Sequence, residues 1–476
     1  MAVHSRARVA AILAAIVALL PASGFAAQPS TAGIDGRVLG LEWALPFAGL
    51  LLSIAFLPLA AKHFWHRHHG KVSAAWAVIL LVPFTLHVGI SGTVAAVAHT
   101  LLLEYVPFVV LLLALFTVAG GVRIAGSLSD SPASNTAVLA FGTVLASIVG
   151  TTGAAVLLVR PLISANRARS RKTHIFVFFL FLVCNIGGAL TPLGDPPLFL
   201  GFLAGVSFFW PTVHLLAPTL VLSGTLLALF FLLERHLYRR EASKAENDGV
   251  RPIRLEGKRN LVLLAGVIGA VLMSGIWHPG INLDVLGTHL GLEMVLRDVI
   301  LVALTVVSLR ITHATIHQAN GFSWFPILEV AKLFAGLFIT IIPAIAILRA
   351  GIGGVLGGWI DLVTDPDGQP IPAMYFWMTG LLSTVLDNAP TYLMFFNMAG
   401  GDAEQLMGPL AATLAAISAG AVFMGANTYV GNAPNFMVKS ICEQYGIRMP
   451  SFFGYMLWSL GILTPLYIVL TFLFFR

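Results

Sequence analysis

Long apolar stretches recur from one end of the chain to the other, separated by short polar segments. Eight of them approach or exceed the roughly 20 residues that an α-helix needs to cross a bilayer. They lie at residues 40–61, 73–92, 104–122, 212–233, 261–277, 296–313, 322–349 and 452–475. With 58% hydrophobic and only 10% charged residues, this pattern predicts an all-α polytopic membrane protein.

Two further apolar stretches are too short to cross a bilayer twice. Residues 134–164 contain a Gly-Thr-Thr-Gly tip at 150–153 and have basic residues on both sides. Residues 372–399 contain the segment 386–390, Leu-Asp-Asn-Ala-Pro, and have acidic residues on both sides. Since a single crossing would exchange sides, we expect two re-entrant hairpins that enter the membrane from opposite faces. Polar backbone at that depth is tolerated only within protein or beside a watery cavity.

Each predicted hairpin is followed by an apolar stretch that is broken at its middle, at 175–209 and at 408–438. The cores GALTPLGDPPLF (188–199) and GANTYVGNAPNF (425–436) match at six of twelve positions with an offset of 237. The hairpin tips align at an offset of 236, which places Thr151-Thr152 on Asp387-Asn388.

The chain is therefore predicted to be an internal duplication, with repeats at 27–233 and 261–476. Each repeat has five spans and one hairpin. Because five is odd, the second repeat is expected to be inverted in the membrane, an arrangement typical of secondary transporters.

The loop charges predict the orientation. The chain has 27 Lys and Arg against 21 Asp and Glu, and basic residues concentrate in the loops at 62–71, 167–172 and 234–260. By contrast, 361–368 and 400–405 carry only acidic charges. Basic loops mark the cytoplasmic side, so the excess positive charge indicates orientation in the bilayer rather than nucleic-acid binding. Residues 234–260 are interpreted as a solvated cytoplasmic linker without chemistry of its own.

The N-terminus has the features of a targeting segment. Arg6 and Arg8 precede a short apolar run and small residues near Ala26, which predicts a cleavable export signal at 1–26, with an uncleaved signal anchor as the alternative. Only two cysteines occur, Cys184 and Cys442, so the sequence implies no disulfide framework.

The candidate chemistry lies at the tips and breaks, where oxygen-bearing side chains gather. Hydroxyls, amides and carboxylates are hard ligands that suit a small alkali cation, and nearby prolines would free backbone carbonyls. We expect Na⁺ to bind at Thr151, Thr152, Asn185, Thr191, Asp195, Asp387, Asn388, Asn427, Thr428 and Asn432. For the amides and hydroxyls, ordinary hydrogen bonds between helices are the alternative interpretation.

Asp195 and Asp387 are the two candidate proton carriers. An intramembrane carboxylate is costly and indicates a functional site. Burial disfavours its charged form whereas a bound cation favours that form, so H⁺ and Na⁺ can compete for it. No cofactor is expected besides these transported ions. Glu104 and Glu329 open two similar spans, at 104–126 and 329–351, and are interpreted as carboxylates at helix N-termini.

The segments VLDNAPTYLMFFN (385–397) and GANTYVGNAPNFMVKSI (425–441) resemble those of the ion transporter superfamily. This superfamily groups NhaD-type sodium:proton antiporters, arsenite pumps and divalent-anion:sodium symporters, and the resemblance is greatest to a bacterial subgroup labelled sodium:proton antiporter or citrate transporter. It implies the inverted-repeat fold, a homodimer, cation sites at the tips and breaks, and a location in the bacterial inner membrane.

The tips depart from those of the symporter branch, which carries Ser-Asn-Thr at both. An aspartate at position 387 would repel a dicarboxylate but could accept a proton, so the departure favours sodium:proton antiport. Sodium-coupled symport of citrate or a dicarboxylate is the alternative. A channel would need a continuous pore, and an enzyme would need a nucleophile with its base or a metal-ligand cluster; neither pattern is apparent in the sequence.

Overall fold

The computed structural model describes residues 34–126, 128–241, 252 and 254–476, so the predicted export signal at 1–26 lies outside the described residues. Within this part of the chain, eight helical segments are long and apolar enough to cross a membrane, and the only sheets are two short two-stranded ones. The prediction of an all-α polytopic membrane protein is confirmed.

The first repeat begins with short 3₁₀ turns at Gly36–Val38 and Leu41–Ala44, followed by α2 (Leu45–Ala60), α3 (Lys62–Thr100), a π-helical stretch (Leu101–Tyr105) and α4 (Val106–Gly120). Gly89 has φ 80°, outside the helical region, and divides α3 into two helices. The chain reverses direction there. Two residues on either side of Gly89, Ser73 and Tyr105, donate hydrogen bonds to the adjacent carbonyls of Lys332 and Ala331 and so lie close together. A straight helix would separate residues 73 and 105 by about 48 Å.

The remainder of the first repeat contains the hairpin, the broken helix and a long span. These elements are β1 (Arg123–Ala125), α5 (Pro132–Val149), α6 (Thr151–Ala165), α7 (Thr173–Leu182), a 3₁₀ turn (Ile186–Leu190), α8 (Pro196–Leu203) and α9 (Trp210–Arg239). The chain turns back at Gly150, whose φ of 82° suits glycine. Asn135 and Asn166 exchange hydrogen bonds at the open end of the hairpin, so both arms start from the same face.

The second predicted repeat likewise has spanning helices followed by a helical hairpin, a broken helix and a final long helix, but it also contains a β-hairpin and short helices without counterparts in the first. It comprises β2 (Arg254–Glu256), α10 (Arg259–Ile276), β3 (Asn282–Val285), β4 (Thr288–Gly291), α11 (Leu292–Ile311), α12 (Ala314–Ala319), α13 (Phe325–Arg349), α14 (Gly357–Ile360), α15 (Pro372–Val385), α16 (Asn388–Met398), α17 (Ala403–Met407), α18 (Ala411–Met424), a 3₁₀ turn (Gly425–Asn427), α19 (Ala433–Gln444) and α20 (Phe452–Phe474). Strand β2 pairs antiparallel with β1, and β3 with β4.

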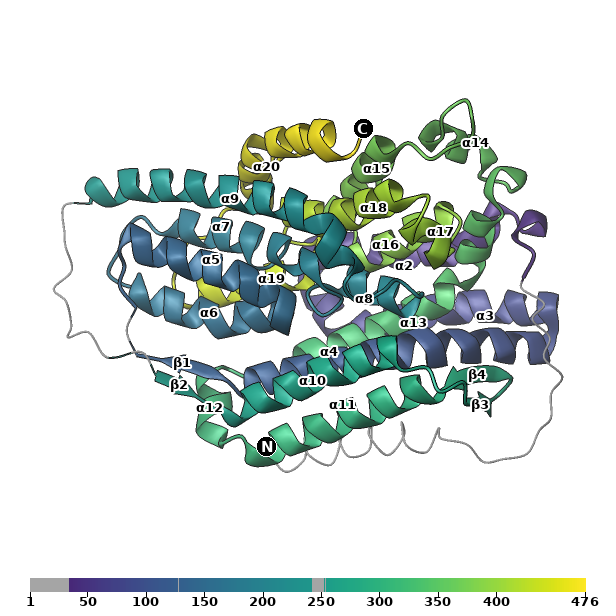
Figure 1. Ribbon diagram of the computed structural model, residues 1–476, viewed down its shortest axis with the longest axis horizontal. Coiled ribbons are helices and arrows are strands. Elements are labelled where there is room, and N and C mark those ends of the chain that lie inside the picture. The colour runs from purple at the N-terminus through teal and green to yellow at the C-terminus, as the bar shows by residue number, and fades with distance from the viewer. Residues whose placement is uncertain (1–33, 127, 242–251, 253) are drawn as a thin grey trace.

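The two broken helices run in opposite directions. Thr173, which begins the first, donates a hydrogen bond to the carbonyl of Arg448, which follows the second. At the other end, the Trp210 indole, after the first broken helix, donates to the carbonyl of Met407, before the second. Figure 1 shows the two hairpins approaching the centre from opposite ends, α5 and α6 from the left and α15 and α16 from the upper right.

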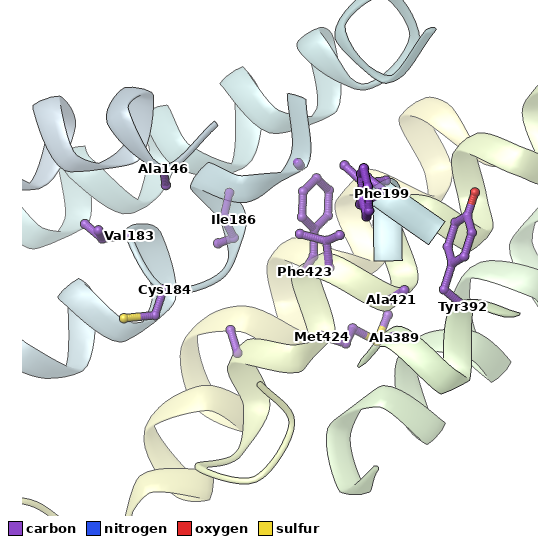
Figure 2. Close-up of a cluster of buried hydrophobic side chains, with 14 of the residues drawn as sticks. Ala146, Val183, Cys184, Ile186, Phe199, Ala389, Tyr392, Ala421, Phe423 and Met424 are labelled. Carbon is purple, nitrogen blue, oxygen red and sulfur yellow. The ribbon is translucent and has the colours of Figure 1, made fainter. Parts of the chain in front are cut away.

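A continuous apolar core joins the broken helices to the second hairpin. Figure 2 shows Phe423 and Met424, at the end of α18, between the break at Ile186 and the side chains of Ala389 and Tyr392 in α16. All five side chains are at most 1% exposed. This packing fixes the backbone at the breaks, where helical hydrogen bonding is interrupted.

The prediction that residues 234–260 form a solvated linker is wrong at both ends. Helix α9 continues to Arg239, and α10 already begins at Arg259. Glu234 is fully buried, where its carboxylate accepts hydrogen bonds from Asn135, Arg169 and His174. These partners compensate the buried charge, which is why a carboxylate can lie inside the protein at this point.

Glu104 also differs from its sequence interpretation. It lies in the π-helical stretch between α3 and α4, inside a continuous helical run rather than at a helix N-terminus. Glu329 lies in the second turn of α13, close to that helix's start. Helix ends also shift slightly from the predicted ranges: the hairpins occupy 132–165 and 372–398, and the broken helices 173–203 and 411–444.

Candidate functional site

Four helices begin at the centre of the molecule, and their N-cap residues form the site. Gly150 caps α6, Asp195 caps α8, Asp387 caps α16 and Asn432 caps α19. The positive ends of four helix dipoles therefore point toward one region, which favours negative charge there. Such a position suits two ionised carboxylates.

The prolines near the site lie at the N-termini of helices rather than inside them. Pro196 and Pro434 occupy the first two positions of α8 and α19, and Pro390 lies in the first turn of α16. An N–H at these positions has no intrahelical partner, so a proline costs little there. The sequence predicted that these prolines free backbone carbonyls. In the structure they mark helix N-termini instead.

Asp195 is the hub of the site. Its Oδ1 accepts hydrogen bonds from Thr151 Oγ1 and Asn432 Nδ2, both at 3.0 Å, and its Oδ2 accepts one from Asn388 Nδ2 at 2.5 Å. The side chain is only 2% exposed. Both hairpin tips and the opposite broken helix thus converge on one carboxylate, whose charged form they favour by donating to it.

Asp387 is placed differently. Its Oδ1 accepts from the backbone N–H of Ala389 at 3.1 Å, as a helix cap does, and the residue remains partly exposed. It shares a cavity of about 110 Å³ with Asp195, Thr151, Thr152 and Asn432. The two candidate proton carriers therefore face one space, Asp195 held by side chains and Asp387 open to the cavity.

The hairpin tips correspond at a different register from the one predicted. Helix α6 begins at Thr151 and α16 at Asn388, so Thr151 corresponds to Asn388 at an offset of 237. The predicted offset of 236 is wrong by one residue, because helix starts rather than the shared polar letters define equivalence. In the corrected register Gly150 matches Asp387 and Asp195 matches Asn432, so each repeat contributes one carboxylate from a different position.

Thr191 and Thr428 shape the two breaks. Thr191 Oγ1 donates to the Ser147 carbonyl and Thr428 Oγ1 donates to the Thr384 carbonyl, while each hydroxyl accepts from a backbone N–H two residues ahead. These repeat-related bonds tie each broken helix to the first arm of its hairpin. The two hydroxyls therefore serve the backbone, which fits the helix-packing alternative for them.

Several buried amide oxygens near the second break have no partner. Asn185 Oδ1, Asn388 Oδ1 and Asn427 Oδ1 are all buried and accept no hydrogen bond from any described residue. Leaving such an acceptor unsatisfied costs roughly 1–3 kcal/mol, so these oxygens are available to a cation or a water molecule.

Three oxygen atoms surround the Cβ position that Gly425 leaves empty. A methyl group at its Cβ position would lie 3.1 Å from the Gly431 carbonyl oxygen, 3.2 Å from Asn185 Oδ1 and 3.6 Å from Ser383 Oγ. This oxygen cradle, defined by Gly425, Gly431, Asn185 and Ser383, is neutral and contains no nitrogen or sulfur ligand. Its donor set fits Na⁺. Among the described residues no group of three or more His, Cys, Asp or Glu side chains could hold a metal ion.

Asn435 was missed by the sequence reasoning. It is fully buried, accepts a 2.8 Å hydrogen bond from Asn185, and donates to the carbonyls of Gly425 and Thr428. It thereby orients the Asn185 side chain and holds the second break. The repeated motif offered one signal, because Asn435 stands where the first repeat has Leu198. The contact with Asn185 could not be predicted, since it depends on how the two repeats pack together.

A cavity of about 500 Å³ leads from the surface to the site. At one end it is lined by the exposed His66, Ser323 and Gln444, and at the other by Asp387 and Asn432. We call this cavity the vestibule. The loop charges predict that its outer end lies on the cytoplasmic side.

Residues 36–475 match the family described as "Putative citrate transport". The chain belongs to this family. The match spans both repeats and every residue of the site, so the site belongs to a multi-pass membrane transporter. A comparison with curated proteins found no match.

Proposed function

We propose that the protein is a secondary active transporter that exchanges Na⁺ for protons by alternating access. The observation that carries the proposal is the Asp195 carboxylate, which accepts hydrogen bonds from both hairpin tips and from the opposite broken helix. A change in its charge alters three contacts, two of which join the two repeats. The family assignment supports a transporter and leaves the ion and the coupling to this proposal.

Protonation of Asp195 would reorganise these contacts. The ionised carboxylate accepts three hydrogen bonds, whereas a protonated one must also donate. Asn388 has a buried Oδ1 that accepts from no described residue and could receive that hydrogen bond. The proton-loaded and sodium-loaded sites would therefore hold the second hairpin tip differently.

Coupling follows from the cost of moving uncompensated carboxylates. Asp195 and Asp387 are both negative when no cation or proton is bound, and carrying such charge past an apolar barrier is expensive. Na⁺ in the oxygen cradle, or protons on the carboxylates, lowers that cost. An empty site would then reorient slowly, so that inward movement of one ion requires outward movement of the other.

The experiment is a proton-release assay with the purified protein in proteoliposomes. Addition of Na⁺ or Li⁺ outside vesicles with an acidic interior should discharge the pH gradient. Asp387→Asn should abolish this discharge without loss of folded protein, because an amide cannot titrate. Retention of normal exchange in that variant would transfer the proton-carrier role to Asp195.

Sodium-coupled symport of citrate or a dicarboxylate is the second candidate. Two observations favour it: the family description and the size of the vestibule, which exceeds what a bare ion needs. Against it, Asp387 faces the same space and would repel the substrate's negative charges. Sodium-dependent uptake of labelled citrate, without proton release by sodium alone, would establish the symporter.

A further inference from the structure

Arg160 and Asn397 occupy equivalent positions in the two hairpins. Each is the tenth residue of its hairpin's second helix, and the two are related by the offset of 237 that relates the rest of the site. Their surroundings differ, because Asn397 is buried in a closed contact whereas Arg160 faces the vestibule. In an inverted repeat, this difference indicates which side of the molecule is closed.

On the side away from the vestibule, the second hairpin is fastened to α13. Arg349, the last residue of α13, donates from Nε to Asn397 Oδ1 at 2.7 Å. Glu104 opens the segment 104–126, as Glu329 opens the similar segment 329–351. The carboxylate of Glu104 lies within electrostatic reach of Arg349. The contact between hairpin and spanning helix is thus made by an arginine and an amide, with a carboxylate near the arginine.

On the vestibule side, an arginine and a carboxylate are also present, but they are not paired with each other. The guanidinium of Arg160 lies against the loop before α13, where a Cβ on Gly321 would come within 2.4 Å of Nη2. Its Nη1 is buried and donates to none of the described residues. A buried guanidinium nitrogen without a partner is costly, so this donor of Arg160 is available to an anionic partner.

Glu329 is the carboxylate available to it. It lines the same vestibule from the second turn of α13, with the imidazoles of His66 and His69 of α3 close enough to act on it electrostatically. The remaining acidic group that lines the vestibule is Asp387, at its floor. Movement of the first hairpin along α13 by one to two helical turns, roughly 5–11 Å, would bring Arg160 level with Glu329.

We propose that Arg160 and Glu329 form an ion pair that closes the vestibule when the site faces the opposite side of the membrane. The closed contact at Asn397 would open in the same movement, since the two repeats exchange conformations during alternating access. The proposal rests on alternating access but not on the identity of the transported ion. In this proposal, the site is closed to the vestibule side when the Arg160–Glu329 pair forms and open to it when the pair is broken.

The test measures access to the vestibule by thiol labelling. Ser440 lines the vestibule, so Ser440→Cys, in a background with Cys184→Ala and Cys442→Ala, reports whether a membrane-impermeant maleimide can enter from the predicted cytoplasmic side. Arg160→Glu should raise the labelling rate severalfold, because two carboxylates repel and the closed state is lost. Glu329→Arg should do the same.

The paired exchange distinguishes a direct contact from a general charge effect. Arg160→Glu combined with Glu329→Arg should return labelling to the parent rate, whereas Arg235→Glu, at an exposed position on α9, should leave it unchanged. Single variants that label like the parent, or a double variant that labels like the sum of the singles, would overturn the proposal. Because labelling requires no ion exchange, its outcome is separable from that of the proton-release assay.

Discussion

Asn388 of the second repeat donates a 2.5 Å hydrogen bond to Asp195 of the first repeat. Its equivalent, Thr151, donates to the same carboxylate from its own repeat. One carboxylate therefore serves two repeat-related hairpin tips, and the two half-sites cannot change independently.

This shared carboxylate predicts unequal effects for the two donors. Asn388→Ala removes the bond that joins the repeats and should lower exchange roughly tenfold or more, since a hydrogen bond to a charged group contributes about 1.5–3 kcal/mol. Thr151→Ala should weaken apparent cation affinity severalfold and leave proton coupling intact, because Asn432 still donates to the same oxygen. Initial rates against Na⁺ concentration in proteoliposomes measure both; equal phenotypes would contradict the cross-repeat role of Asn388.

The carboxylates themselves should be indispensable for coupling. Asp195→Asn and Asp387→Asn each remove a titratable group, so proton movement driven by Na⁺ should fall to the background of empty vesicles. Asp367→Asn, at an exposed position, is the control and should transport normally. The proton fluxes are read from a pH dye inside the vesicles, and monodisperse elution in detergent shows that the variants fold.

Gly425 tests the oxygen cradle without altering charge. Its φ of −57° is compatible with alanine, so Gly425→Ala should fold but place a methyl group among the cation's expected ligands. We expect at least a tenfold loss of apparent Na⁺ affinity. Gly224→Ala, in α9 with open space around it, should have no effect. Unchanged sodium affinity in Gly425→Ala would place the cation elsewhere.

The buried cluster at the base of the first hairpin should control stability. Glu234→Gln removes the buried one of the two carboxylates that pair with Arg169 and leaves the guanidinium with Glu241 alone; breaking a buried pair costs up to about 3–5 kcal/mol. A marked drop in the midpoint of thermal unfolding in detergent is therefore expected. Glu256→Gln removes a half-exposed pair with Arg123 and should change stability by less than about 1 kcal/mol. Similar midpoints for the two variants would show that the cluster is not structural.

The hydropathy and charge patterns predicted the helical, polytopic architecture because the lengths of apolar segments reflect the bilayer. They also indicated polar chemistry at Asp195 and Asp387, since ionisable residues in apolar segments are rare. Contacts formed only in three dimensions could not be predicted. Asn435 looked like an ordinary helix residue until Asn185, 250 positions away, was brought against it.

Glu234 shows the opposite difficulty. It stands beside a run of charged residues and so has the pattern of a solvated segment, yet Asn135, Arg169 and His174 enclose it. Glu104 was misinterpreted because Pro107, three residues on, has the pattern of a helix start, whereas the π-helical stretch joins α3 and α4 into one run. In both cases packing decided the environment of a charge that the local pattern had placed in water or at a helix end.

The most direct test of the central claim is proton release by purified protein in liposomes at a series of pH values. The exchange model predicts that Na⁺ alone, with no organic anion present, discharges an acidic interior, and that apparent Na⁺ affinity falls as the pH is lowered because protons occupy Asp195 and Asp387. It predicts no uptake of labelled citrate. Sodium-dependent citrate uptake without proton release by Na⁺ alone would contradict the exchange model.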